Sequence, residues 1–157
     1  MKFRYRSVIS MDSETGAPLL LMRPEIPFTV VGSRGCVTYS ALVDTGADNV
    51  VFPRSVADQL GIDLSPSHRS EAVGFGGGSV ALLCGTATLE IADSTSVLRW
   101  SSQVLFSDCQ PQDDDVILLG YFGFLEFFQA NFDGLRGWLE LIANHRLPLD
   151  KTISSRN

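Results

Sequence analysis

The stretch SALVDTGADNVVFP, residues 40–53, places an acidic residue directly behind an apolar run. Asp44 follows the apolar segment 41–43, and the apolar pair Val50 and Val51 comes soon after it. A carboxylate that enters a core position is costly unless it is paired or hydrogen-bonded. The position of Asp44 therefore requires a structural or a chemical reason.

Composition limits the classes of protein to consider. A chain of 157 residues with 45% hydrophobic residues predicts one globular domain with a real core. The formal net charge of −6 argues against a nucleic-acid partner, which would require a basic face. No apolar run approaches the roughly 20 residues of a membrane span, and the basic start is not followed by an apolar stretch of signal-peptide length. We expect neither a nucleic-acid partner nor a membrane span.

The three cysteines, Cys36, Cys84 and Cys109, are odd in number and lack CxxC spacing. This pattern argues against a disulfide framework and against a zinc site. The thiols are expected to be buried or inert. We therefore expect a soluble protein of a reducing, cytoplasmic compartment, without a metal or another cofactor.

The first half of the chain shows mainly strand patterns. The segment Ser-Arg-Gly, 33–35, predicts a hairpin turn between the first two strands. Helical spacing after residue 53, with Pro53 near its start and Gly61 at its end, predicts a short helix over 53–61. The polar segment 62–70 is interpreted as a loop. The predicted strands here are 26–32, 36–43 and 49–52.

The second half adds further strands and a second helix. The glycine-rich segment 74–78 is expected to form the tip of a hairpin over 71–92, and 107–115 is expected to be a polar loop. The aromatic-rich segment 121–132 predicts a helix, and the tail after Pro148 is polar. The remaining predicted strands are 96–106, 116–120 and 136–142. Many short strands with two short helices predict an all-β closed or sandwich-like architecture.

Asp44, Thr45 and Gly46 combine a carboxylate, a hydroxyl and a residue without a side chain. Aspartate oxygens accept nearby backbone N–H groups in tight turns, and glycine lets another backbone approach closely. Such a loop can present a carboxylate rigidly at the floor of a cleft. An ordinary Asx-turn between two strands is the alternative interpretation.

The order of these motifs resembles the retropepsins, the retroviral-type aspartic proteases, and more closely their bacterial relatives. The resemblance spans roughly residues 23–142. It implies an all-β, single-lobe acid protease barrel over 23–147 with a flap hairpin and one or two short helices. Residues 1–22 would be an amino-terminal extension and 148–157 a polar tail. The stretches that carry the resemblance are 23–30, 41–48, 73–78 and 116–128.

The chain departs from the retropepsin pattern after the apolar strand that ends at Gly120. Retropepsins usually continue there with Arg-Asn or Arg-Asp, and the arginine supports the dimer contact. This chain continues with Tyr121 and Phe122. Asp48, which belongs to the same network in the family, has no obvious arginine partner in the sequence.

The resemblance implies hydrolysis by two carboxylates that share one proton. This chain has a single Asp-Thr-Gly triplet and no Asp-Ser-Gly, so the second carboxylate would come from a second copy in a C2 homodimer. Asp44 would be the catalytic residue, with peptide or protein as substrate. The residues expected to bind substrate or shape the site are Thr45, Gly46, Ala47, Asp48 and the flap glycines Gly76, Gly77 and Gly78.

Other interpretations remain open. The glycines could form a plain hairpin turn, and Asp48 could be a solvated or structural carboxylate. The acidic run 113–115 is expected to be a solvated loop, and His68 and His145 lie far apart in sequence. We expect a homodimeric aspartic endopeptidase. The alternatives are a non-catalytic dimerisation or peptide-binding module of the same fold, and a regulator that acts within a larger assembly.

Overall fold

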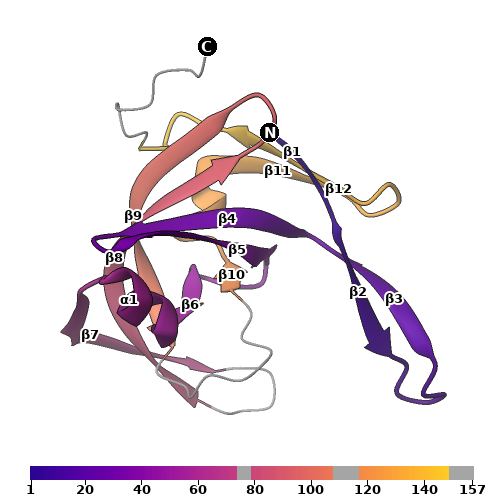
Figure 1. The fold of residues 1–157 in the computed structure, drawn as a ribbon, viewed down its shortest axis with the longest axis horizontal. Coiled ribbons are helices and arrows are strands. Elements are labelled where there is room, and N and C mark those ends of the chain that lie inside the picture. The colour runs from indigo at the N-terminus through magenta and orange to yellow at the C-terminus, as the bar shows by residue number, and fades with distance from the viewer. Residues whose placement is uncertain (74–78, 108–116, 149–157) are drawn as a thin grey trace.

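A computed structural model describes residues 1–73, 79–107 and 117–148, without the side chains of 66–73 and of Ser79. Six strands form a closed mixed barrel (Figure 1). Their order around the barrel is β4 (Glu25–Gly32), β5 (Gly35–Val43), β10 (Ile117–Leu119), β6 (Val51–Pro53), β9 (Val97–Ser107) and β8 (Ser79–Ala92). The pairing of β4 with β8 closes the ring. The all-β barrel prediction is thus confirmed.

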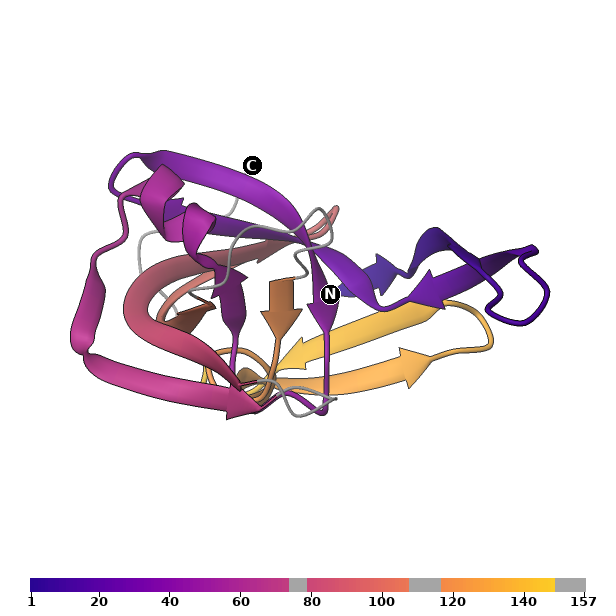
Figure 2. The same cartoon turned by 90° about the horizontal axis from the view of Figure 1, so that it is seen from below.

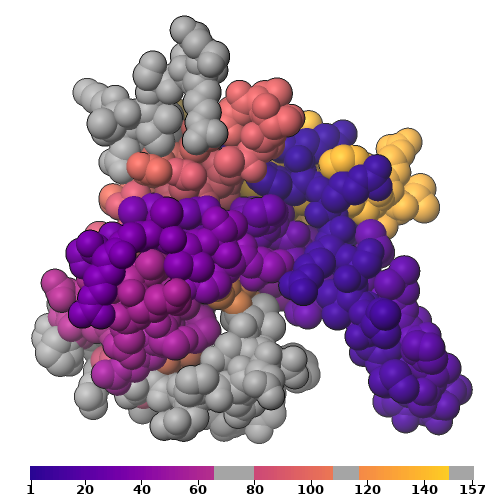
Figure 3. Space-filling model, viewed as in Figure 1, coloured from indigo at the N-terminus to yellow at the C-terminus, as the bar shows by residue number. Residues whose placement is uncertain are grey.

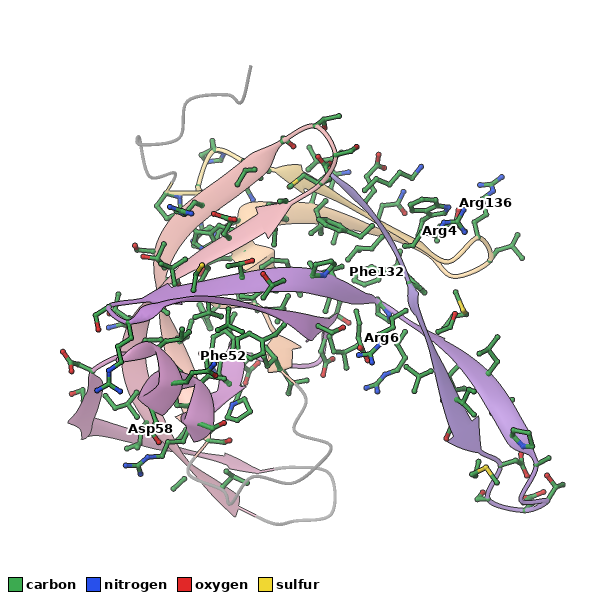
Figure 4. All side chains as sticks on the ribbon, in the orientation of Figure 1. Arg4, Arg6, Phe52, Asp58, Phe132 and Arg136 are labelled. Atoms are coloured by element: carbon green, nitrogen blue, oxygen red, sulfur yellow. The ribbon has the colours of Figure 1, made fainter. Side chains whose placement is uncertain are left out.

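Aromatic side chains fill the barrel. Figure 4 shows Phe52, from the short strand β6, pointing into this interior. The indole nitrogen of Trp100 donates to the carbonyl oxygen of Gly123 at 3.1 Å, so its polar group is satisfied in the core. The fully buried aromatic side chains are Phe28, Phe52, Trp100, Phe106 and Phe124.

The hairpin and the first helix agree with the sequence patterns. In the β4–β5 hairpin, Gly32 pairs with Gly35, which leaves a two-residue turn between the strands. The helix α1 spans Arg54–Leu60 and buries Val56 and Leu60. It ends where Gly61 adopts a left-handed conformation with φ of 65°, which glycine tolerates without strain.

The prediction of a loop over 62–70 is wrong, because β7 spans Leu64–Val73 and pairs with β8. Within the described part of the chain, β7 pairs with β8 alone and lies outside the closed ring. Pro66 and the polar residues of this segment favour a loop in the sequence, and pairing with β8 overrides that preference. The glycine-rich segment 74–78 lies outside the described residues, as do 108–116 and 149–157.

The prediction of a helix over 121–132 is also wrong. Only a 3-10 turn, η1 (Leu125–Phe127), forms there, and β11 (Phe128–Asp133) follows it. Gly123 has a φ of 91°, which α-helical geometry does not allow. The strand β12 (Trp138–Ala143) then pairs with β11 over its whole length. The aromatic spacing matched a helical period, but pairing with β12 decided the outcome.

The amino-terminal segment forms three strands. The strand β1 (Lys2–Arg4) pairs with β12, so a three-stranded sheet β1-β12-β11 lies beside the barrel. The strands β2 (Arg6–Met11) and β3 (Pro18–Arg23) pair only with each other among the described strands. We call this hairpin, residues 6–23, the arm. Figure 2 shows the arm and the β11–β12 hairpin projecting from the same side of the barrel.

The helices and the cysteines give two further findings. No helix in the described residues is long and apolar enough to cross a membrane. Of the cysteines with described side chains, Cys36 is exposed and Cys84 is partly buried, and both are free. The expectation of a buried thiol is therefore wrong for Cys36, and its inertness stays a prediction. Cys109 lies outside the described residues.

Candidate active site

Asp44 follows β5 directly, at the point where the chain leaves the barrel wall. Its backbone N–H donates to the carbonyl oxygen of Leu119 in β10 at 3.2 Å. Its side chain is only partly buried, and Oδ1 accepts the N–H of Gly46 at 2.9 Å. The carboxylate thus avoids the cost of complete burial, and the loop itself supplies a hydrogen bond that orients it.

The loop that carries Asp44 is tied to the segment after β10 by backbone hydrogen bonds. The N–H of Tyr121 donates to the carbonyl oxygen of Ala47 at 2.9 Å, and that of Phe122 donates to Asp48 at 2.8 Å. The N–H of Val50 returns a bond to Phe122 at 3.1 Å. After the role that the sequence predicts for Asp44, we call residues 44–50 the catalytic loop. These bonds hold it against the end of β10, so the position of Asp44 depends on a segment far away in sequence.

Gly120 makes this close approach possible. A Cβ atom on residue 120 would lie 2.5 Å from the carbonyl oxygen of Ala47, and it would also collide with the backbone of Asn49. Real Cβ atoms essentially never come within 3.0 Å of such atoms, so only glycine fits without moving the catalytic loop. The sequence suggested a glycine-terminated strand here, but it did not show what that glycine contacts.

The other predicted residues of the loop are accessible. Thr45, Gly46 and Asp48 are exposed, and Ala47 is partly buried. Within the described residues, the Thr45 hydroxyl has no hydrogen-bond partner and Asp48 belongs to no ion pair. Both groups are thus free to meet a substrate or a second chain. Gly76, Gly77 and Gly78 lie outside the described residues, as does the acidic run 113–115.

The aromatic cluster after Gly120 divides into two groups. Phe124, Phe127 and Phe128 are buried in the core. Tyr121 and Phe122 are 47% and 55% exposed, and their rings meet edge to face with centroids 5.1 Å apart. Because the backbone of both residues binds the catalytic loop, this exposed aromatic pair lies beside Asp44's loop. It occupies the place where the retropepsin pattern has its arginine.

An ion cluster around the buried Glu25 supports the strand before Asp44, and sequence reasoning missed it. Glu25 is the buried charged residue of the described core. Its carboxylate binds Arg6 at 2.9 Å and Arg23 at 3.2 Å, and it accepts the Ser40 hydroxyl at 3.0 Å. Glu25 pairs with Leu42, two residues before Asp44. The members of this cluster are spread over 35 positions, from Arg6 to Ser40, so no local motif announced it.

A pocket of about 450 Å³ adjoins the catalytic loop at Asn49. Asn49, Phe122, Gln103 and Glu126 are among its lining residues. Glu126 is held in place there, since it accepts the Gly123 N–H at 2.9 Å and pairs with Arg146 at 3.2 Å. In the described part of the chain, no group of three or more His, Cys, Asp or Glu side chains is arranged to hold a metal ion.

Comparison with known protein families gives one match. The family model described as aspartyl protease matches residues 26–121, which is more than half of the chain. The match begins in β4, contains the catalytic loop and ends just after Gly120. No curated protein matches the chain.

Proposed function

Because the chain belongs to the aspartyl protease family, we propose that it is a homodimeric endopeptidase that hydrolyses peptide bonds in peptide or protein substrates. One observation carries the proposal. The Asp44 carboxylate is partly exposed on a loop that β10 and Gly120 hold in one position. A carboxylate that is both oriented and accessible can act on a bound substrate and a water molecule.

The chemistry requires two carboxylates in different protonation states. Two like charges placed close together do not both ionise, so one carboxyl group keeps its proton. The ionised carboxylate removes a proton from water, which attacks the scissile carbonyl carbon. The protonated carboxyl group polarises the carbonyl oxygen, and a proton passes to the leaving amine when the C–N bond breaks. Water supplies the oxygen, so no acyl-enzyme is formed.

A second copy of the chain supplies the second carboxylate in this proposal. The sequence holds one Asp-Thr-Gly triplet, and a C2 axis beside the catalytic loop would bring Asp44 of each protomer together. The exposed Thr45 hydroxyl is available to bond across the axis. The exposed pair Tyr121 and Phe122 replaces an arginine-based contact with apolar packing in this proposal.

The roles of the surrounding residues follow from the same arrangement. Gly46 and Asp48 would meet the substrate backbone, with Ala47 beside them, because all three lie on the loop next to the catalytic carboxylate. Gly76, Gly77 and Gly78 would form a flap that closes over the peptide and excludes water. These assignments rest on the family pattern.

Peptide cleavage by wild type and by Asp44→Asn tests the proposal. An amide does not serve as a general base, so Asp44→Asn should fold normally and lose cleavage of a peptide library. Asp58→Asn is the matched control, because Asp58 is an exposed carboxylate on α1 (its side chain is 71% exposed). It should cleave like the wild type.

An inhibitor separates the proposed enzyme from a non-catalytic module. A hydroxyl-bearing transition-state mimic such as pepstatin should bind the wild type and block cleavage. A peptide-binding or dimerisation module of the same fold would give no cleavage with any library. Equal cleavage rates for wild type and Asp44→Asn would contradict the role of Asp44.

A further inference from the structure

The arm carries an unusual share of the exposed apolar surface. Of the eleven large hydrophobic side chains that are exposed in the described residues, six belong to this one hairpin. They are Ile9, Met11, Leu19, Leu20, Leu21 and Met22. Figure 3 shows the far end of the arm projecting away from the other described residues, while at its root Met22 lies close to Gly137 in the turn between β11 and β12. A two-stranded hairpin is marginally stable alone, and a contiguous apolar patch marks an interaction surface.

The two faces of the arm differ. Cross-strand pairing places Ile9 opposite Leu20, with Met11 and Met22 on the same face. We call these four side chains the apolar face. Ile9, the most exposed of the four, has a relative exposure of 75%. The opposite face carries Leu19 and Leu21, which are less exposed. The apolar face is therefore the side with more surface to bury.

The root of the arm is held in a fixed direction. Arg6 and Arg23 lie directly opposite each other across the two strands, where like charges repel. Glu25 lies between them and binds both, at 2.9 and 3.2 Å. Figure 4 shows Arg6 at the junction of the arm and the barrel. Because Glu25 is buried in the barrel wall, this cluster anchors the arm to the body.

A backbone hydrogen bond connects the root of the arm to the residue that precedes Asp44. The carbonyl oxygen of Pro24, the residue after the arm, accepts the N–H of Val43 at 3.0 Å, and Asp44 follows Val43. The strand β5 runs toward the side from which the arm projects (Figure 1). A second copy whose Asp44 reaches this Asp44 would therefore lie next to the arm.

We propose that the arm clasps the second copy of the chain and buries its apolar face there, an inference that rests on the homodimer in the proposed function. The C2 axis makes the contact occur twice, once for each arm. Burial of apolar area stabilises such a contact. The arm would then hold the two Asp44 residues together without the arginine contact that the retropepsin pattern uses.

Sedimentation equilibrium of the full chain tests the inference. The double variant Ile9→Lys with Leu20→Glu removes the centre of the apolar face, while its opposite charges face each other across the strands and preserve the hairpin. We expect the dimer dissociation constant to rise by at least about tenfold. Met11→Lys, at the last residue of β2, changes an exposed side chain of the same face and should also weaken the dimer.

The matched control changes the other face of the same hairpin. Ser10 pairs with Leu19 there, so Ser10→Lys with Leu19→Glu introduces the same charges next to the first pair. This control should leave the dissociation constant within about threefold of the wild type. Equal weakening by both double variants would overturn the assignment of the apolar face, and unchanged dimerisation in every arm variant would overturn the inference.

Failure of the inference and failure of the proposed function give different results. All variants are also measured with Asp44→Asn, which prevents self-cleavage. A wild type that cleaves peptides while its arm variants dimerise normally overturns the arm inference alone. A chain that dimerises through the arm but never cleaves peptides supports the arm inference and contradicts the proposed function.

Discussion

Gly120 packs against Ala47 so closely that a Cβ atom on residue 120 would lie 2.5 Å from the Ala47 carbonyl oxygen. The same carbonyl oxygen accepts the N–H of Tyr121 at 2.9 Å. The catalytic loop thus packs on one side against backbone atoms of the segment after β10. Because Asp44 precedes Ala47 by three residues, this contact helps to set where the carboxylate stands.

Gly120→Ala adds only one methyl group, but it should lower both the rate of cleavage and the stability of the fold. The methyl group collides with backbone atoms, and these move only if the whole catalytic loop moves. A displacement of about 1 Å at a catalytic group costs on the order of a hundredfold in rate, and we expect a loss of that size in kcat/KM. The free energy of unfolding should fall by about 1–3 kcal/mol.

Gly134→Ala is the control for that substitution. A Cβ atom at Gly134, in the turn between β11 and β12, has nothing within 4 Å. The Gly134→Ala variant should leave both peptide cleavage and the denaturation midpoint at wild-type values. If Gly120→Ala also behaved like the wild type in both measurements, the close packing of Gly120 against the catalytic loop would be wrong.

On dilution, the cleavage rate should fall faster than the protein concentration. Only a dimer carries two Asp44 carboxylates, so dilution below the dissociation constant removes active sites as well as protein. Specific activity measured over a dilution series should fall and then follow the dimer fraction from sedimentation. A strict monomer with full specific activity would rule out the shared dyad.

The pH profile of cleavage should rise and fall around an optimum. At low pH both carboxyl groups of the dyad are protonated and no base remains, whereas at high pH both are ionised and no acid remains. Since ordinary carboxyl groups titrate near pH 4, we expect the optimum on the acidic side of neutrality. The two limbs belong to the pair rather than to a single Asp44. A profile that rises steadily into alkaline pH, with sensitivity to thiol reagents or chelators, would contradict the mechanism.

Asp93 should stabilise the fold at neutral and weakly acidic pH and lose this effect in stronger acid. A backbone hydrogen bond from Thr95, with further bonds from the Thr95 hydroxyl and from Ser96, holds the pKa of the Asp93 carboxyl well below its usual value. The stabilisation is present above the unfolded pKa near 4 and is lost as the pH falls through the lower folded pKa. Asp93→Ala should therefore reduce the free energy of unfolding by about 1 kcal/mol at neutral pH.

Urea denaturation at several pH values measures this contribution. The difference between wild type and Asp93→Ala should shrink as the pH falls below about 4. Asp63→Ala serves as the control, because Asp63 is an exposed loop aspartate without such turn hydrogen bonds among the described residues. A constant difference at all pH values would show that the Asp93 carboxylate does not stabilise its turn.

Local patterns were sufficient for much of the barrel and for the candidate catalytic residue. The two-residue alternation predicted β9, whose Trp100, Val104 and Phe106 are buried on one face. Gly61 predicted the end of α1, because a helix commonly ends at a glycine with positive φ. The Asp-Thr-Gly triplet after an apolar strand indicated Asp44 as the residue to test. Each of these features depends on neighbours within a few positions, which the sequence displays directly.

Contacts between distant segments decided the rest. Residues 128–133 form a strand because β12 pairs with them, and Leu64–Val73 form a strand because β8 does. The amino-terminal segment, expected only as an extension, pairs β1 with β12 near the other end of the chain. Glu25 is buried because Arg6 and Arg23 neutralise it, and no local pattern contains that cluster. The hydrogen bonds and charges of such partners depend on which segments meet, so only the tertiary structure determined where these residues lie.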